Sequence, residues 1–128
     1  MSKEKGTRAE RELLHKFWQT GEWAVMRAPG SGSTQYASPD LLVGNRSKKL
    51  AIECKSCAKD RQYLTNDEIE QLKKFADIFG AEPWVSVRFD RDGWYFFMLE
   101  DLEKTENNYV VSKEIAQRRG LSFEELVR

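Results

Sequence analysis

The chain has 128 residues, of which 40% are hydrophobic and 33% are charged, and its 21 Lys and Arg balance its 21 Asp and Glu. This length and this supply of apolar side chains favour a single domain spanning residues 1–128. No apolar run approaches the ~18 residues of a membrane span, and no apolar stretch follows the charged start as it would in a signal peptide, so we expect a cytoplasmic protein.

The net charge of zero hides an uneven distribution of charge along the chain. Residues 1–61 hold 12 Lys and Arg against 7 Asp and Glu, whereas residues 62–128 hold 9 against 14. Domains that bind nucleic acids are often strongly basic. The first half is therefore the favoured surface for a polyanion.

The first half of the chain predicts a helix followed by three strands. Apolar residues recur at helical spacing from Thr7 to about Gln19, with Gly21 where the helix would end, and Glu10 shares their face. Residues 23–27, 40–45 and 49–56 are typical of short strands, with a Gly- and Ser-rich loop after the first and a turn after the second. Three successive strands predict an antiparallel meander.

The second half predicts another helix and two more strands. Thr65 and Glu68 have the spacing of a capping box, and an apolar stripe runs from there to Gly80. Residues 84–89 and 94–99 predict a hairpin, because the Asp-Gly pair between them favours a tight turn. With short C-terminal helical pieces after an irregular stretch, the order of elements is αβββαββ.

The stretch of strand around Glu53 carries the chemistry that we consider most informative. Side chains alternate between the faces of a strand, so Glu53 and Lys55 share one face and Cys54 takes the other. Asp40 begins the preceding strand and can reach the same region. Two carboxylates are oxygen ligands suited to Mg²⁺, and a neighbouring Lys can stabilise charge on a phosphodiester. These residues predict a metal site that handles phosphate.

The sulfur atoms of the same stretch allow a different interpretation. Cys54 and Cys57 form a C-x-x-C spacing, which is found in metal and redox sites. A structural zinc needs four ligands, but His15 is the only histidine that could join the two thiols. A redox dithiol normally opens a helix, whereas Cys54 lies within a predicted strand. We therefore favour the carboxylates over the sulfurs.

Several motifs resemble one family from end to end. P-D followed by E-x-K on adjacent strands is the pattern of the restriction-endonuclease-like nucleases. The segments KGTRAERELL, VMRAPGSGS, SPDLLVGN, IECKS and LEKTENNYVV are similar to those of the archaeal Holliday junction resolvases, over about residues 5–126. The resemblance implies an α/β fold of the restriction-endonuclease-like type, with a mixed five-stranded sheet flanked by helices.

The resemblance also assigns roles to individual residues. It implies that Glu10 joins Asp40 and Glu53 as a metal ligand, that Lys55 acts on the phosphate and that Ser31 approaches the scissile phosphate. Taken alone, Glu10 would more often be a surface acid or an acid of the first helical turn, and Ser31 could be a plain loop residue; the resemblance reverses the preference for Glu10. The implied metal is Mg²⁺, for which Mn²⁺ can substitute.

The resemblance further implies a DNA surface and a dimer. Arg11, Arg27 and Arg88 correspond to basic residues that contact DNA, and each would neutralise a phosphate. Phe75 and Phe79 correspond to residues at the interface of a homodimer, although their spacing is also that of core residues. A two-fold dimer suits a four-way junction, because its two sites can nick symmetric strands.

The expected function is metal-dependent hydrolysis of phosphodiesters in four-way DNA junctions, giving paired symmetric nicks during recombination and repair. Recognition should depend on backbone shape more than on base sequence, because the candidate contacts are dispersed cations. Two alternatives remain open: another nuclease of this fold that cuts duplex or flap DNA, and a junction-binding protein without catalysis.

Overall fold

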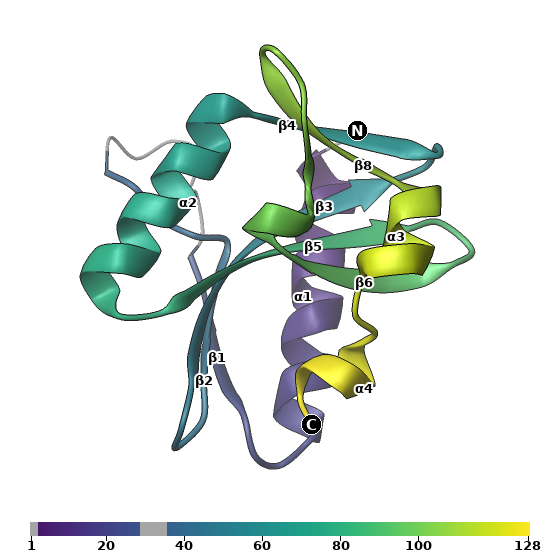
Figure 1. Ribbon diagram of the computed structural model, residues 1–128. Coiled ribbons are helices and arrows are strands. Elements are labelled where there is room, and N and C mark those ends of the chain that lie inside the picture. The colour runs from purple at the N-terminus through teal and green to yellow at the C-terminus, as the bar shows by residue number, and fades with distance from the viewer. Residues whose placement is uncertain (1–2, 29–35) are drawn as a thin grey trace.

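The first helix packs against one face of a central sheet. The computed structural model describes residues 3–28 and 36–128. Helix α1 (Lys3–Gln19) buries Leu13 and Phe17 completely, which confirms the apolar stripe predicted there. Gly21 follows the helix with a left-handed φ of 76°. Figure 1 shows α1 passing behind the sheet.

The central sheet is mixed and has five strands, as the sequence predicts. Strands β1 (Ala24–Arg27), β2 (Leu41–Gly44) and β3 (Lys49–Cys57) form an antiparallel meander. Strand β5 (Glu82–Phe89) pairs with β3 in parallel, and β6 (Gly93–Met98) returns antiparallel to β5. The order across the sheet is β1-β2-β3-β5-β6.

Helix α2 (Asn66–Phe79) connects the two parallel strands. The predicted capping box is confirmed, because Thr65 accepts a hydrogen bond from the Glu68 N–H while the Glu68 carboxylate accepts one from the Thr65 N–H. Gly80 ends the helix with a φ of 85°, a conformation that glycine adopts without steric cost. A crossover helix of this kind is the usual link between parallel strands.

The structure also has a second, smaller sheet that the sequence did not predict. Strand β4 (Arg61–Thr65), strand β8 (Asn108–Ser112) and strand β7 (Glu103–Lys104) form it in the order β4-β8-β7. The 3-10 turn η2 (Leu99–Asp101) precedes β7. The stretch expected to be irregular is therefore largely a hairpin, whose two-residue strand β7 is too short to produce a sequence pattern.

The C-terminal helical pieces close the fold as predicted. Helix α3 (Lys113–Arg119) begins at a Ser112 cap, and helix α4 (Phe123–Leu126) begins at the capping box of Ser122 and Glu125. Leu121 forms a bridge to Phe96, which ties this segment to the outer strand β6.

Two hydrophobic clusters lie on opposite faces of the sheet. One joins α1 and α4 to the side of β3 that carries Leu50, Ile52 and Cys54. The other joins α2, α3 and the second sheet to the side that carries Ala51 and Cys57. The chain thus has the layered helix-sheet-helix arrangement expected of the predicted fold. No helix in residues 3–28 or 36–128 has the length and apolar character needed to cross a bilayer.

Gly120 is expected to be required for the packing of α3 against β6. A Cβ atom at Gly120 would lie 2.7 Å from the Ala116 carbonyl oxygen and 3.0 Å from the Phe97 ring. Gly120→Ala should therefore lower the free energy of unfolding by about 1–3 kcal/mol, measured by urea denaturation. Gly44→Ala is the matched control, because its nearest neighbour would be at 3.5 Å, and a comparable loss in the control would contradict this explanation.

Candidate functional site

Asp40 ties the end of β1 and the start of β2 to the middle of β3. Its backbone carbonyl accepts a hydrogen bond from the Ala28 N–H at 3.0 Å, and its own N–H donates to the Ile52 carbonyl at 3.0 Å. Its carboxylate accepts a hydrogen bond from the Cys54 N–H at 2.8 Å. Asp40 is only 8% exposed. These bonds place a carboxylate at the start of β2, where β3 continues beyond its pairing with β2.

Strand β3 separates the carboxylate chemistry from the thiol chemistry. Lys55 reaches Glu68 on α2, so the face that carries Glu53 and Lys55 is the α2 face, whereas Cys54 packs in the cluster beneath α1. The predicted alternation is confirmed. Cys57 lies in the cluster on the face opposite to Cys54, so the two thiols do not form a common site.

Lys55 is held as an ammonium beside the acids. Its Nζ donates to Glu68 Oε2 at 2.6 Å, and both side chains are largely shielded from solvent. Burial lowers the pKa of Lys55, but the hydrogen bond and charge of Glu68, followed by the charge of Glu53, outweigh burial and leave the pKa raised. A Lys in this state stabilises negative charge and does not act as a general base.

Glu10 approaches the same region from α1. Its carboxylate accepts a hydrogen bond from Arg27 Nε at 2.7 Å, and both side chains are mostly buried. Burial raises the pKa of Glu10; the hydrogen bond from Arg27 lowers it, and the charge of Asp40 raises it. The influence of Asp40 indicates that the two acids lie within electrostatic reach. The acid on the apolar face of α1 thus has a partner.

Glu53 carries the strongest electrostatic conflict of the site. Burial, followed by the negative charge of Asp40, raises the pKa of Glu53 to about 9, against the lowering effect of Lys55. Glu68 and Glu10 add smaller contributions in the same direction. Two carboxylates held close together in a place shielded from water favour either a proton or a cation between them.

The donor set fits a hard divalent cation. Asp40 and Glu53 supply carboxylate oxygens, and Mg²⁺ typically takes one or two carboxylates and fills its other positions with water and substrate oxygen. In the described ranges, no three acidic, His or Cys side chains converge into a finished metal cage. Glu10 contributes to the field at Glu53, but its carboxylate points to Arg27.

The other predicted residues that the structure describes lie on α1, β5 and α2. Arg11 is exposed on α1, and Arg88 on β5 is bound to Glu12. Phe75 and Phe79 lie on α2 with their rings stacked 5.3 Å apart. Ser31 lies outside the described residues. Glu68, which holds Lys55, was not predicted as part of the site, because its capping-box position already explained it.

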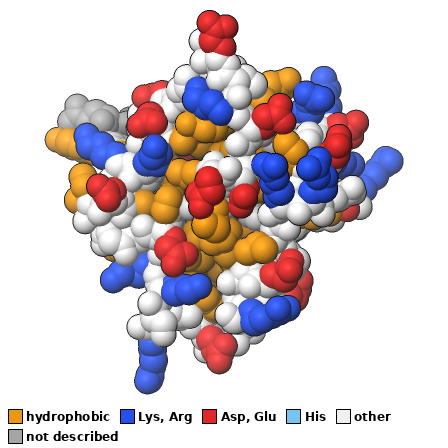
Figure 2. All heavy atoms as spheres, viewed as in Figure 1, with side chains coloured by type: hydrophobic (Ala, Val, Ile, Leu, Met, Phe, Trp, Pro, Cys, Tyr) orange, Lys and Arg blue, Asp and Glu red, His pale blue; other side chains and the backbone are white. Residues whose placement is uncertain are grey.

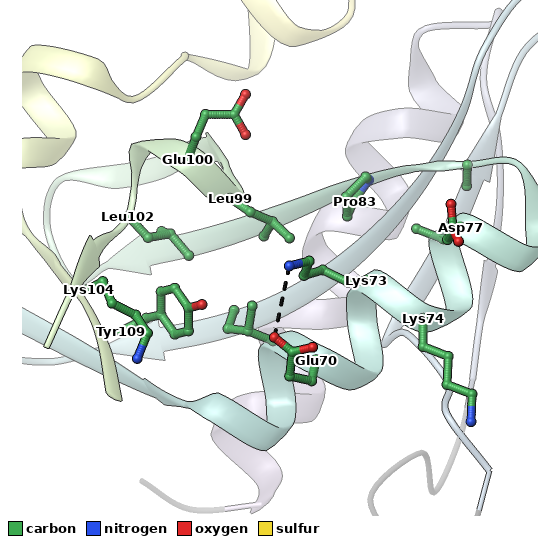
Figure 3. A pocket seen from close by; sticks show the side chains of 13 residues that line it. Glu70, Lys73, Lys74, Asp77, Pro83, Leu99, Glu100, Leu102, Lys104 and Tyr109 are labelled. Atoms are coloured by element: carbon green, nitrogen blue, oxygen red, sulfur yellow. Dashed lines mark ion pairs between the residues drawn. The ribbon is translucent and has the colours of Figure 1, made fainter. Parts of the chain in front are cut away.

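A large groove lies away from these acids. It measures about 960 Å³ and lies between α2 and the β7-β8 hairpin, with Ile69, Leu99 and Leu102 among its apolar lining. Figure 2 shows apolar side chains gathered in the middle of this face, bordered by charged ones. In Figure 3 the Glu70 and Lys73 ion pair lies at its edge. None of the predicted catalytic residues lines it.

The raised pKa of Glu53 predicts how stability depends on pH without metal. The pKa of this carboxyl group rises on folding from its ordinary value of 4.5 to about 9. The folded protein therefore loses stability steadily as pH rises between these two values. Glu53→Gln removes this titration. The variant should therefore have a higher melting temperature than the parent at pH 8 in EDTA, and a flatter dependence on pH, both followed by circular dichroism.

Glu22→Gln serves as the control for that experiment, because Glu22 is an exposed carboxylate in the turn after α1. It should reproduce the pH profile of the parent protein. An unchanged profile in Glu53→Gln would mean that Glu53 is not protonated in the folded, metal-free protein.

Comparison with known proteins gives a consistent family assignment. The family model described as archaeal Holliday junction resolvase (hjc) matches residues 1–128. The chain is 42% identical to the crossover junction endodeoxyribonuclease Hjc of Archaeoglobus fulgidus, over 96% of this chain and 95% of the relative. It is 34% identical to the protein of the same name from Methanocaldococcus jannaschii, over 87% and 78% of the two chains.

A solved structure supports the same assignment. The structure of Archaeoglobus fulgidus Hjc, described as a Holliday junction resolvase from an archaeal hyperthermophile, superimposes with a TM-score of 0.89 at 39% identity. The match covers 96% of this chain and all of the other. The fold is therefore the restriction-endonuclease-like fold that the motifs implied. The chain belongs to the archaeal Holliday junction resolvase family.

Proposed function

We propose that this protein is a divalent-metal-dependent endonuclease that resolves four-way DNA junctions by hydrolysing phosphodiesters. The observation that carries the proposal is the placement of Asp40, Glu53 and Lys55 together where β3 runs beyond the start of β2. The relative from Archaeoglobus fulgidus, named a crossover junction endodeoxyribonuclease, supports the choice of substrate.

Mg²⁺ is the proposed metal, with Asp40 and Glu53 as its main ligands and Glu10 as the third acid. Mn²⁺ can take its place, because both ions accept carboxylate and water oxygen. When bound, the cation supplies positive charge that stabilises the charge developing on the phosphodiester. It would also favour the ionised form of Glu53, whose pKa is raised by burial and by Asp40.

Lys55 is proposed to donate to an oxygen of the scissile phosphate. Its raised pKa keeps the ammonium charged, and Glu68 fixes it from α2 through the contact at 2.6 Å. A donor that is already oriented costs no reorganisation during the reaction. Ser31, which lies outside the described residues, remains a proposed positioning residue. Arg11, Arg27 and Arg88 are the proposed contacts to DNA phosphates.

A homodimer is proposed to form through the exposed aromatic face of α2. Phe79 is 46% exposed and Ile78 is 77% exposed, and a contiguous exposed apolar patch marks a candidate interaction surface. Together with Phe75 and Tyr36 they line a depression of about 480 Å³. A two-fold axis through this face would give one active site for each of two symmetric strands of a junction.

The first test of this function is cleavage of a mobile four-way junction and of linear duplex under Mg²⁺. We expect paired symmetric nicks in the junction and little cutting of the duplex, analysed on labelled continuous strands. Preferential cutting of the duplex would instead favour another nuclease of this fold. Lys55→Met should slow junction cleavage about 100-fold or more while binding is retained.

Lys48→Met is the matched control, because Lys48 is an exposed Lys in the turn before β3. It should cleave at the rate of the parent protein. Equal rates for Lys48→Met and Lys55→Met would remove Lys55 from the proposed site, and a parent protein that binds junctions without cutting them would favour a purely architectural role.

The dimer is tested with Phe79→Glu in sedimentation velocity. The substitution places a charge in the apolar face of α2 and should convert a dimer into a folded monomer of half the mass. Trp18→Glu is the control, because Trp18 is a comparably exposed aromatic residue on α1. A Phe79→Glu variant that stays dimeric would place the interface elsewhere.

A further inference from the structure

A compact basic pocket lies on the side of α1 that faces β5. It measures about 290 Å³, and three cations and one carboxylate are among its lining residues, which are Lys5, Arg8, Ala9, Glu12, Ser56 and Arg88. Lys5, Arg8 and Glu12 follow one face of α1, because they are three and four residues apart. Ser56 and Arg88 come from adjacent positions on the parallel strands β3 and β5.

Two carboxylates, Glu12 and Asp90, form ion pairs with the cations of this pocket. Arg88 Nε donates to Glu12 Oε2 at 2.9 Å, and Arg88 Nη1 lies 3.5 Å from Asp90 Oδ1. Lys5 Nζ lies 2.8 Å from Asp90 Oδ2. Trp94 Nε1 donates to the same Glu12 oxygen at 2.5 Å. The charged groups thus form a connected cluster at the C-terminal end of β5.

These ion pairs are suited to exchange with another anion. The side chains of Lys5, Arg88, Asp90 and Glu12 are between 28% and 45% exposed. Pairs at this level of exposure contribute only about 0–1 kcal/mol each. A phosphodiester accepts from the planar Arg fork at least as well as a carboxylate does. No ion pair of Arg8 occurs within the described ranges, and it lines the same pocket.

The pocket lies beside the proposed catalytic site but is distinct from it. Glu12 is two residues beyond Glu10, so the two point to opposite sides of the helix. Ser56 is three residues beyond Glu53 on β3 and therefore about 10 Å farther along the strand.

We propose that this pocket binds a non-scissile phosphodiester of the DNA backbone, whose oxygens replace Glu12 on Arg88 and Asp90 on Lys5. Arg8 and the Ser56 hydroxyl complete the phosphate site. The assignment of the bound group as part of the DNA strand rests on the proposed nuclease function. Glu12 and Asp90 act as internal counter-ions, which neutralise the cations of the pocket until DNA binds.

The proposal is tested by measuring junction affinity over a range of KCl concentrations in EDTA, using fluorescence anisotropy. Arg8→Gln should weaken binding and reduce the slope of log K against log salt by about one, because one phosphate contact is lost. Glu12→Gln should tighten binding about two- to five-fold, because it removes a competing exposed carboxylate.

Matched controls separate a local contact from a change in net charge. Arg46→Gln and Glu124→Gln make the same charge changes at exposed positions in the β2-β3 turn and in α4. Both should have markedly smaller effects than their counterparts in the pocket. Weaker binding by Glu12→Gln, or an effect of Arg8→Gln no larger than that of Arg46→Gln, would overturn the proposal.

A structural readout follows the displacement of Glu12 directly. The indole N–H of Trp94 donates to Glu12, so its NMR resonance, identified by its absence in Trp94→Phe, should shift when DNA binds. An unmoved resonance at saturation would also overturn the proposal. The effects should occur with junction and duplex alike, since phosphates carry no sequence or branch information. A parent protein without junction preference would therefore defeat the proposed function while leaving the pocket supported.

Discussion

The hydrogen bond from the Cys54 N–H to the Asp40 carboxylate is the contact on which the candidate site depends. Strand β2 starts at Leu41 opposite Ile52, so β2 offers no backbone hydrogen-bond partner to β3 beyond that point. Asp40 takes over this role with its side chain at 2.8 Å, while its N–H and carbonyl bind Ile52 and Ala28. One residue therefore ends the pairing of β2 and fixes an acid beside Glu53. The second half of β3 is left with β5 as its partner in the sheet.

The neutral net charge has a structural explanation in how the important cations are paired. Arg27 binds Glu10, Lys55 binds Glu68 and Arg88 binds Glu12. Each of these three cations is thus matched by a carboxylate from another element. A count of charges over the whole chain cancels these pairs and conceals the basic surface. Polyanion binding in such a protein is an exchange of partners, which explains how zero net charge is compatible with a nucleic-acid substrate.

The sequence predicts those parts of the fold that have local causes. The capping boxes at Thr65 and Ser122, the α1 stripe and the alternation of β3 are all consequences of neighbouring residues, and the structure has them. Strands β4 and β7 depend on pairing with β8, a long-range contact that no periodicity records. Glu68 was missed for a related reason: its contact with Lys55 spans 13 residues and is hidden behind a capping role.

The alternation of β3 also sets the geometry between the proposed catalytic site and the proposed phosphate pocket. Glu53 and Lys55 face α2, while Cys54 packs beneath α1 and Ser56 lines the pocket beside that helix. Both sites are therefore built on one continuous strand, whose rise per residue is nearly constant. Because β3 is paired with β5 along its length, the distance between the sites cannot change without breaking the sheet. A rigid spacing of this kind favours recognition of backbone shape over recognition of base sequence, since it measures the path of the phosphates alone.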